Sequence, residues 1–115
     1  MGEFQKAILD CDNIIKLDPK NAYAYSNRGF YYANLGEYHK AIKLAPEYAQ
    51  TYLNRGIAYK QLQGFNKEAC ADFYQSGILF LEQNNKTKAL SCVEQIKETD
   101  PSSPLVDELM KQINQ

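Results

Sequence analysis

Apolar residues return every three or four positions along most of this chain, the spacing that places them on one face of an α-helix. The clearest case runs from Glu3 to Leu17, where the apolar residues are Phe4, Ala7, Ile8, Cys11, Ile14 and Ile15. Asp18-Pro19 follows, and proline does not continue a helix. The pattern therefore predicts an amphipathic helix over Glu3–Leu17.

Residues that favour turns and helix ends divide the rest of the chain into six more predicted helices. These run from Ala22 to about Leu35, Glu37 to about Leu44, about Tyr48 to Leu62, Asn66 to Gln83, Lys86 to Glu98, and from Pro104 onward. Gly36 is expected to stop the first of them, and Asn21 and Ser103 to cap the helices that follow them. Asn84-Asn85 suits left-handed backbone. No segment has a strand signal, so the predicted fold class is all-α with about seven helices.

Part of the second predicted helix returns 27 residues later in the chain. Tyr25, Asn27, Arg28, Gly29, Tyr32, Leu35 and the preceding Pro19 recur as Tyr52, Asn54, Arg55, Gly56, Tyr59, Leu62 and Pro46. An internal repeat indicates stacked units that cannot bury their apolar faces alone. Glycine inside a helix costs about 1 kcal/mol relative to alanine, so Gly29, Gly56 and Gly77 are predicted to mark close helix–helix approach. Large side chains are expected to fill the space nearby, and small ones to leave room for them: Tyr32, Tyr59 and Phe80, and Ala7, Ala41, Ala69 and Ala89.

This pattern resembles the tetratricopeptide repeat, a helix–turn–helix unit of about 34 residues. The matching stretches are Tyr25-x2-Arg28-Gly29-x2-Tyr32 with Ala41 and Pro46, Tyr52-x2-Arg55-Gly56-x2-Tyr59 with Ala69-x3-Phe73, Phe73-x2-Ser76-Gly77-x2-Phe80 with Ala89-x3-Val93 and Pro101, and Ala7-x3-Cys11 with Pro19. The resemblance covers about residues 2–101. It implies a right-handed α-solenoid of antiparallel helix pairs.

The spacing also indicates where the chain departs from a regular repeat. The alanine and the proline of the second helix are twelve residues apart in two repeats, but Ala41 and Pro46 are only five apart, so that helix is seven residues short. A second shortening predicts that Asn66–Gln83 is a helix shared by two repeats. The expected organisation is a single domain over 1–115, divided into a half repeat 2–21, a shortened repeat 22–48, a repeat 49–83, an overlapping last repeat 70–101 and a capping helix 102–115.

Proteins of the tetratricopeptide repeat family, which this chain resembles, hold an extended peptide or a helix of a partner protein in a concave groove. The first helix of each repeat lines that groove. The resemblance places these positions in the groove: Tyr23, Ser26, Asn27, Phe30, Ala33 and Asn34 from one helix, and Gln50, Leu53, Asn54, Ile57, Lys60 and Gln61 from the next. Asn27 and Asn54 are the main candidates, because an amide can hydrogen-bond any peptide backbone. The alternative is that each bonds a neighbouring helix.

The basic residues of these helices have two possible roles. Arg28 and Arg55 are expected to reach a carboxylate, either within the chain, which we favour, or on a ligand. Together with Lys60 they predict a weakly positive groove.

Composition narrows the function further. A net charge of -1 argues against nucleic acid as a partner, because phosphate binding needs a basic excess. No apolar run approaches the ~20 residues that span a bilayer, and the N-terminus lacks a signal peptide's pattern, so no membrane partner is expected and the predicted compartment is the cytoplasm. The three cysteines Cys11, Cys70 and Cys92 are far apart, which favours reduced core thiols over a disulfide or a metal site. His39 is expected to face solvent.

The sequence gives no indication of catalysis. It has no nucleophile with a nearby histidine, no glycine-rich phosphate loop and no metal-ligand spacing, so we predict no catalytic residue, cofactor or metal. The predicted function is a protein–protein interaction scaffold that binds a protein or peptide ligand. One alternative is a self-assembly module, a homodimer formed through the N-terminal half repeat and the shortened helix, with or without exchanged helices. The other alternative is a docking arm of a larger enzyme complex. The sequence also leaves open that the chain is a fragment of a longer array.

Overall fold

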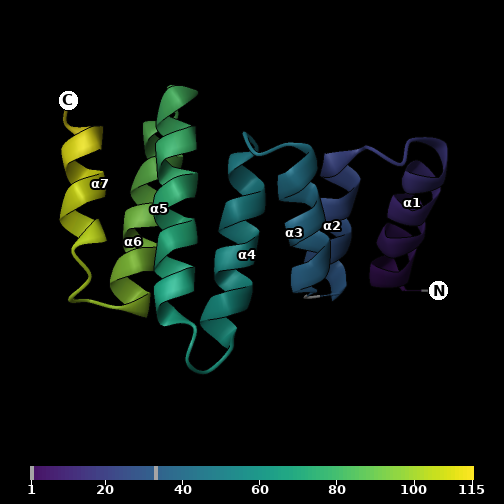
Figure 1. The fold of residues 1–115 in the computed structure, drawn as a ribbon, viewed down its shortest axis with the longest axis horizontal. Helices are drawn as coiled ribbons and strands as arrows, with labels where there is room; N and C mark the ends of the chain where they lie inside the picture. The colour runs from purple at the N-terminus through teal and green to yellow at the C-terminus, as the bar shows by residue number, and fades with distance from the viewer. Residues whose placement is uncertain (1, 33) are drawn as a thin grey trace. The chain divides into compact units, whose positions relative to one another are not determined.

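The computed structural model of the protein describes residues 2–32 and 34–115. Over these residues it contains seven α-helices and no strand (Figure 1). The helices are α1 (Glu3–Leu17), α2 (Ala22–Tyr32), α3 (Leu35–Leu44), α4 (Ala49–Gln61), α5 (Asn66–Glu82), α6 (Lys86–Thr99) and α7 (Leu105–Ile113). The prediction of an all-α helical repeat fold is confirmed.

Short polar side chains begin several of these helices, as the sequence predicted. Asn21 Oδ1 accepts a hydrogen bond from the backbone N–H of Ala24 (2.9 Å), and Ser103 Oγ accepts one from Leu105 (3.2 Å). Each bond satisfies one of the N–H groups that the start of a helix leaves without a helical partner. Asn84 has a φ of 60°, so the left-handed turn between α5 and α6 is also confirmed.

The predicted boundary between α2 and α3 was wrong. Gly36 was expected to end α2 near Leu35, but α2 ends at Tyr32 and Leu35 already begins α3. The reason is Asn34, whose side-chain oxygen accepts a hydrogen bond from the backbone N–H of Gly36 (2.9 Å). Asn34 therefore caps α3, and Gly36 lies in the first turn of that helix.

Close packing divides the chain into two compact units. Unit 1 comprises residues 1–47 and contains α1 to α3, and unit 2 comprises residues 48–115 and contains α4 to α7. The division falls after α3, the helix that the sequence identified as shortened. The single domain and its internal repeat boundaries stay a prediction.

In unit 1, α2 packs against both α1 and α3. A Cβ added at Gly29 would lie 3.0 Å from the ring of Tyr38, so the glycine permits the close approach of α2 and α3 that was predicted. Tyr38 fills this space and is only 2% exposed. Tyr32 was expected to supply buried area here, and this was wrong, because it is the last residue of α2 and its side chain is 53% exposed.

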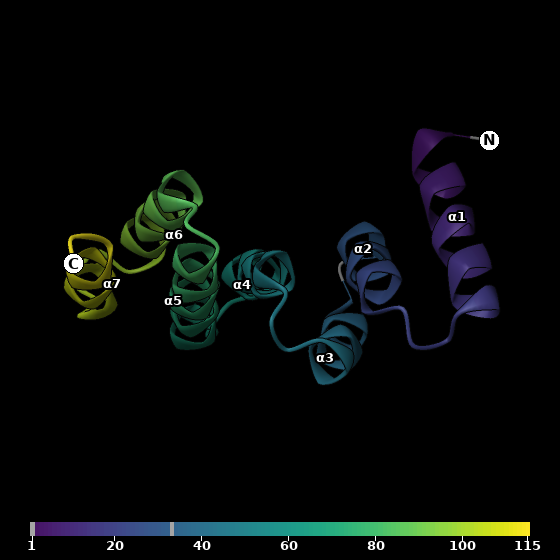
Figure 2. The ribbon, with the colours of Figure 1, turned by 90° about the horizontal axis from the view of Figure 1, so that it is seen from above.

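In unit 2, α5 packs against α4 and α6, and α7 packs against α5 and α6 (Figure 2). α5 is one continuous helix of 17 residues and ends one residue before the predicted Gln83, and its sharing between two repeats stays a prediction. A Cβ at Gly56 would lie 2.7 Å from the Phe73 ring, and one at Gly77 would lie 2.6 Å from the Leu109 side chain. Both glycines therefore mark close helix–helix contacts.

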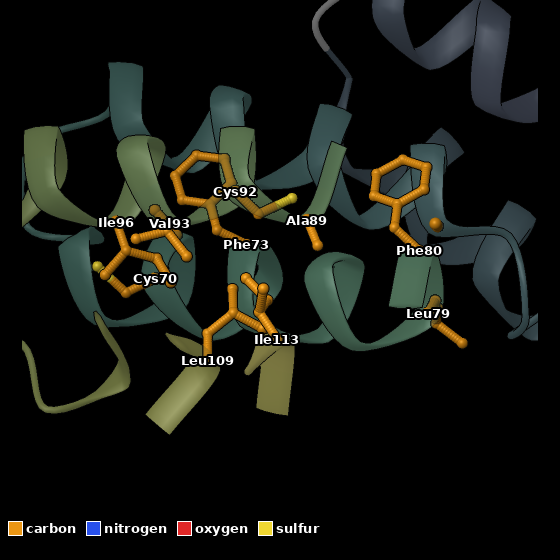
Figure 3. Packing of buried hydrophobic residues seen from close by; sticks show 12 residues of the cluster. Cys70, Phe73, Leu79, Phe80, Ala89, Cys92, Val93, Ile96, Leu109 and Ile113 are labelled. Atoms are coloured by element: carbon orange, nitrogen blue, oxygen red, sulfur yellow. The ribbon is translucent and has the colours of Figure 1, made fainter. Parts of the chain in front are cut away.

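The main hydrophobic core lies in unit 2, as Figure 3 shows. Its largest fully buried side chains include Phe73, Ile96, Leu109 and Val93. Buried polar atoms among them find partners: Ser76 Oγ of α5 donates a hydrogen bond to the carbonyl oxygen of Ala49 at the start of α4 (2.8 Å). These contacts hold α4 to α7 together.

Candidate functional site

One face of α2 exposes aromatic side chains instead of burying them. Tyr23 is 61% exposed and Phe30 is 52% exposed, and because seven residues are close to two helical turns, the two rings lie on the same side of the helix. Half-buried Asn27 lies between them. The sequence predicted all three as groove positions, and that role stays a prediction.

Two further rings extend this surface. Tyr31 packs edge-to-face against Phe30 with 5.5 Å between ring centroids, and against Phe4 of α1 with 5.0 Å between centroids. Phe4 is itself 51% exposed. We call the surface formed by Phe4, Tyr23, Asn27, Phe30 and Tyr31 the aromatic face.

The other predicted positions near α2 do not add to the aromatic face. Ser26 is buried, with 4% of its surface exposed, so it offers little area to a ligand. The side-chain oxygen of Asn34 is occupied in capping α3. Ala33 lies outside the described residues.

The predicted positions of α4 belong to unit 2 and are described there. Asn54 is 8% exposed, and its side-chain oxygen accepts a hydrogen bond from the side-chain amide of Gln50 (3.0 Å). Leu53 and Ile57 are half-buried and pack against the core of unit 2. Gln50 and Gln61 are exposed. The bonded Gln50–Asn54 pair is thus the polar feature of this face.

Lys60, also predicted as a groove residue, bonds α6. Its ammonium group lies 2.9 Å from Glu98 Oε2 and donates to Gln95 Oε1 at 3.2 Å. Gln95 and Glu98 were not predicted as partners of Lys60. They lie 35 and 38 residues beyond Lys60, and the sequence carries no signal that pairs them.

Arg28 joins the three helices of unit 1. Its Nε and one terminal nitrogen donate to both oxygens of Glu37 on α3 (2.9 and 3.1 Å), and its other terminal nitrogen donates to Asp12 on α1 (2.8 Å). Hydrogen bonding to the Glu37 carboxylate, with a smaller contribution from Asp12, raises the pKa of Arg28. The guanidinium also lies 5.5 Å from the ring centroid of Tyr25.

Arg55 makes the equivalent bond in unit 2. Its Nε and a terminal nitrogen donate to both oxygens of Asp72 on α5, each at 2.8 Å. This hydrogen bonding raises the pKa of Arg55, and Asp72 is only 5% exposed. The preference for carboxylate partners within the chain is confirmed for both arginines. The expected weakly positive groove was wrong, because carboxylates of the chain balance the charges of Arg28, Arg55 and Lys60.

The three cysteines are free thiols buried in the protein, so their prediction as core residues is confirmed. Burial raises the pKa of each thiol, which keeps it protonated and poorly nucleophilic. His39 is exposed. Within residues 2–32 and 34–115, no three histidine, cysteine or acidic side chains are grouped to hold a metal ion. In the same part of the chain, no helix combines the length and the apolar composition needed to span a membrane.

Residues 11–43 match a family model described as tetratricopeptide repeat. This segment begins inside α1, contains all of α2 and ends inside α3, so it includes Tyr23, Asn27 and Phe30. A search of the curated proteins found no match to the chain.

Proposed function

Because this chain carries a tetratricopeptide repeat over residues 11–43, and such repeats generally mediate protein–protein interaction, we propose that it binds a peptide or a helix of a partner protein. The binding surfaces are the aromatic face in unit 1 and the exposed face of α4 in unit 2. The observation that carries the proposal is the exposure of Tyr23 and Phe30 beside the amide of Asn27 within the matched segment.

The chemistry of the aromatic face supports a protein ligand. Large aromatic side chains contribute most of the binding energy at many protein interfaces, because they bury much apolar area and lose little conformational entropy. Phe30 and Phe4 each leave about half of their surface in water, at 52% and 51% exposed. A ligand that covers them removes this apolar area from water, and Asn27 can hydrogen-bond its backbone.

The contribution of α4 is expected to be smaller. Asn54 is nearly buried and already accepts a hydrogen bond from Gln50. A ligand on this face meets mainly the side-chain amides of Gln50 and Gln61, which are exposed. Ordering such side chains costs conformational entropy, so they add less to binding than rings that are already held.

Co-purification tests the proposal. The wild-type chain and the double variant Asn27→Ala/Asn54→Ala are each used to isolate partners from cells that express the chain. Loss of the wild-type partners, with unchanged sedimentation of the variant, supports binding through these faces. The matched control is Gln75→Ala/Gln112→Ala, which removes two exposed amides from α5 and α7 and should retain every partner. An unchanged set of partners for Asn27→Ala/Asn54→Ala contradicts the proposal.

A second candidate function, self-association, is favoured by the apolar surface of α1. Leu17 is 88% exposed and Ile14 is 43% exposed. Sedimentation at increasing concentration should then show a dimer that Leu17→Asp abolishes. A monomer at every concentration removes this candidate and leaves the interaction with a different protein.

A further inference from the structure

The part of the aromatic face that lies on α2 carries no unpaired charge. Arg28 is the one charged residue in the sequence of α2, and its guanidinium is bonded to Glu37 and Asp12. Between Tyr23 and Phe30 the ligand therefore meets aromatic rings and one neutral amide. A charged ligand would lose water there without gaining a partner charge. The surface is complementary to an uncharged segment.

Tyr23 and Phe30, the two outer aromatic residues, have a spacing along α2 that a polyproline II segment can match. Tyr23 and Phe30 are seven residues apart, which at about 1.5 Å per residue corresponds to about 10 Å along α2. A polyproline II helix rises about 3.1 Å per residue with three residues per turn, so its residues i and i+3 lie on one side, about 9 Å apart. The two spacings therefore agree to within about 1–2 Å.

The residue between the rings fits the same conformation. Polyproline II has no internal hydrogen bonds, so its carbonyl groups remain available to an external donor. Asn27 is four residues after Tyr23 and three before Phe30, and its side-chain amide has two N–H donors. It can thus bond a carbonyl of a segment whose residues i and i+3 cover the two rings.

We propose that the aromatic face binds an uncharged, proline-containing segment in the polyproline II conformation, with two prolines three positions apart on Tyr23 and Phe30. This inference rests on the proposed interaction function and specifies the ligand of unit 1. Proline rings pack flat on aromatic rings, and a segment that is already extended loses little conformational entropy on binding.

Calorimetric titration of the full chain with synthetic peptides tests this inference. The probe is an uncharged peptide with blocked ends and two prolines at positions i and i+3. A second peptide of the same composition has its prolines adjacent, which places the rings about 3 Å apart instead of about 9 Å. We expect the second peptide to bind about tenfold more weakly, and the affinity of the first to be insensitive to salt.

Variants of α2 locate the site. Tyr23→Ala and Phe30→Ala should each weaken binding of the first peptide about tenfold. The matched control is Tyr32→Ala, because Tyr32 is an equally exposed tyrosine of the same helix, 53% exposed, and the nine residues from Tyr23 place it on the opposite side. Circular dichroism verifies folding, and the 61% exposure of Tyr23 makes Tyr23→Ala the variant least able to disturb it.

Three outcomes overturn the inference: no binding of the first peptide, equal binding of the two peptides, or an equal effect of Tyr32→Ala. If these occur while Tyr23→Ala still loses the partners isolated by co-purification, the interaction function stands and its ligand is of another class, such as a helix. If partners and peptide are both unaffected by Tyr23→Ala, the interaction function at this face fails as well.

Discussion

Units 1 and 2 are built from similar helices, but they bury their apolar residues to different extents. The described residues include twelve large hydrophobic side chains that are exposed, and eight of them lie in unit 1, although it is the smaller unit. The buried set of unit 1 is mostly alanine, with Cys11, Tyr25 and Tyr38, whereas unit 2 buries Phe73, Phe80, Ile96 and Leu109. Unit 1 therefore exposes large apolar side chains of the kind that unit 2 buries in its core.

The second helices of the two units also differ in length. α3 has 10 residues and α5 has 17, which correspond to about 15 Å and about 25 Å of helix. Four of the eight exposed side chains of unit 1 lie on α1, so the length of α3 alone does not set how much apolar surface unit 1 buries.

The largest effect is expected from a substitution in the core of unit 2. Phe73 is fully buried, and Phe73→Ala should lower the free energy of unfolding by about 3–5 kcal/mol, because it removes apolar contacts and leaves a cavity. Phe30→Ala in unit 1 should change it by about 0.5 kcal/mol or less, since that ring is half exposed. Urea denaturation measures both. Similar losses would show that the two units do not differ as described.

The next effect compares the two arginine pairs. Asp72→Asn should destabilise the chain by about 2–3 kcal/mol, because Asp72 is nearly buried and the variant leaves Arg55 without its carboxylate. Glu37→Gln should cost about 1 kcal/mol, because Arg28 keeps Asp12. Thermal denaturation of the two variants shows which of them loses more stability. A larger loss for Glu37→Gln would contradict this prediction.

Alkaline pH should weaken unit 1 through Tyr38. Burial raises the pKa of Tyr38 from 10.0 to about 12, so the unfolded chain releases this proton more readily than the folded one. The stabilisation is therefore complete below pH 10 and is lost as the pH rises toward 12, by about 2 kcal/mol. Denaturation of Tyr38→Phe at several pH values isolates this contribution, and its pH profile should be flatter than that of the wild type. Parallel profiles would refute the assignment to Tyr38.

The smallest effect concerns the cap of α3. Asn34→Ala should cost about 1 kcal/mol, because the backbone N–H of Gly36 loses its acceptor, while Asn34→Ser should restore most of it. Hydrogen exchange of the amides of α3 measures the change. If Asn34→Ser loses partners but keeps its stability, Asn34 contacts a ligand in addition to capping the helix.

Local residue chemistry accounts for what the sequence predicted well. Asn21, Ser103 and Asn84 act through bonds and backbone angles within a few residues, and these depend little on the rest of the fold. The predictions failed where two local signals competed, as when the cap from Asn34 outweighed the stop at Gly36. They also failed where a distant partner decided the outcome.

At the candidate site, too, features set by nearby residues could be predicted, whereas contacts with distant partners could not. The resemblance to the tetratricopeptide repeat predicted Tyr23 and Phe30 as groove positions, and helical periodicity alone places the two on one side of α2. The partners of the arginines could not be named, since Asp12 and Asp72 lie 16 and 17 residues away and the chain has 14 acidic residues to choose from. The contact of Phe4 with Tyr31 likewise depends on how α1 packs on α2.

The position of Arg28 between two carboxylates has a consequence for the order in which unit 1 opens. If α1 separates from α2, the guanidinium keeps both bonds to Glu37, and if α3 separates, it keeps the bond to Asp12. Neither event leaves a half-buried cation without a counter-ion, which is the state that makes partial opening costly. The ion pairs of Arg28 therefore do not by themselves require the three helices of unit 1 to part in a single step.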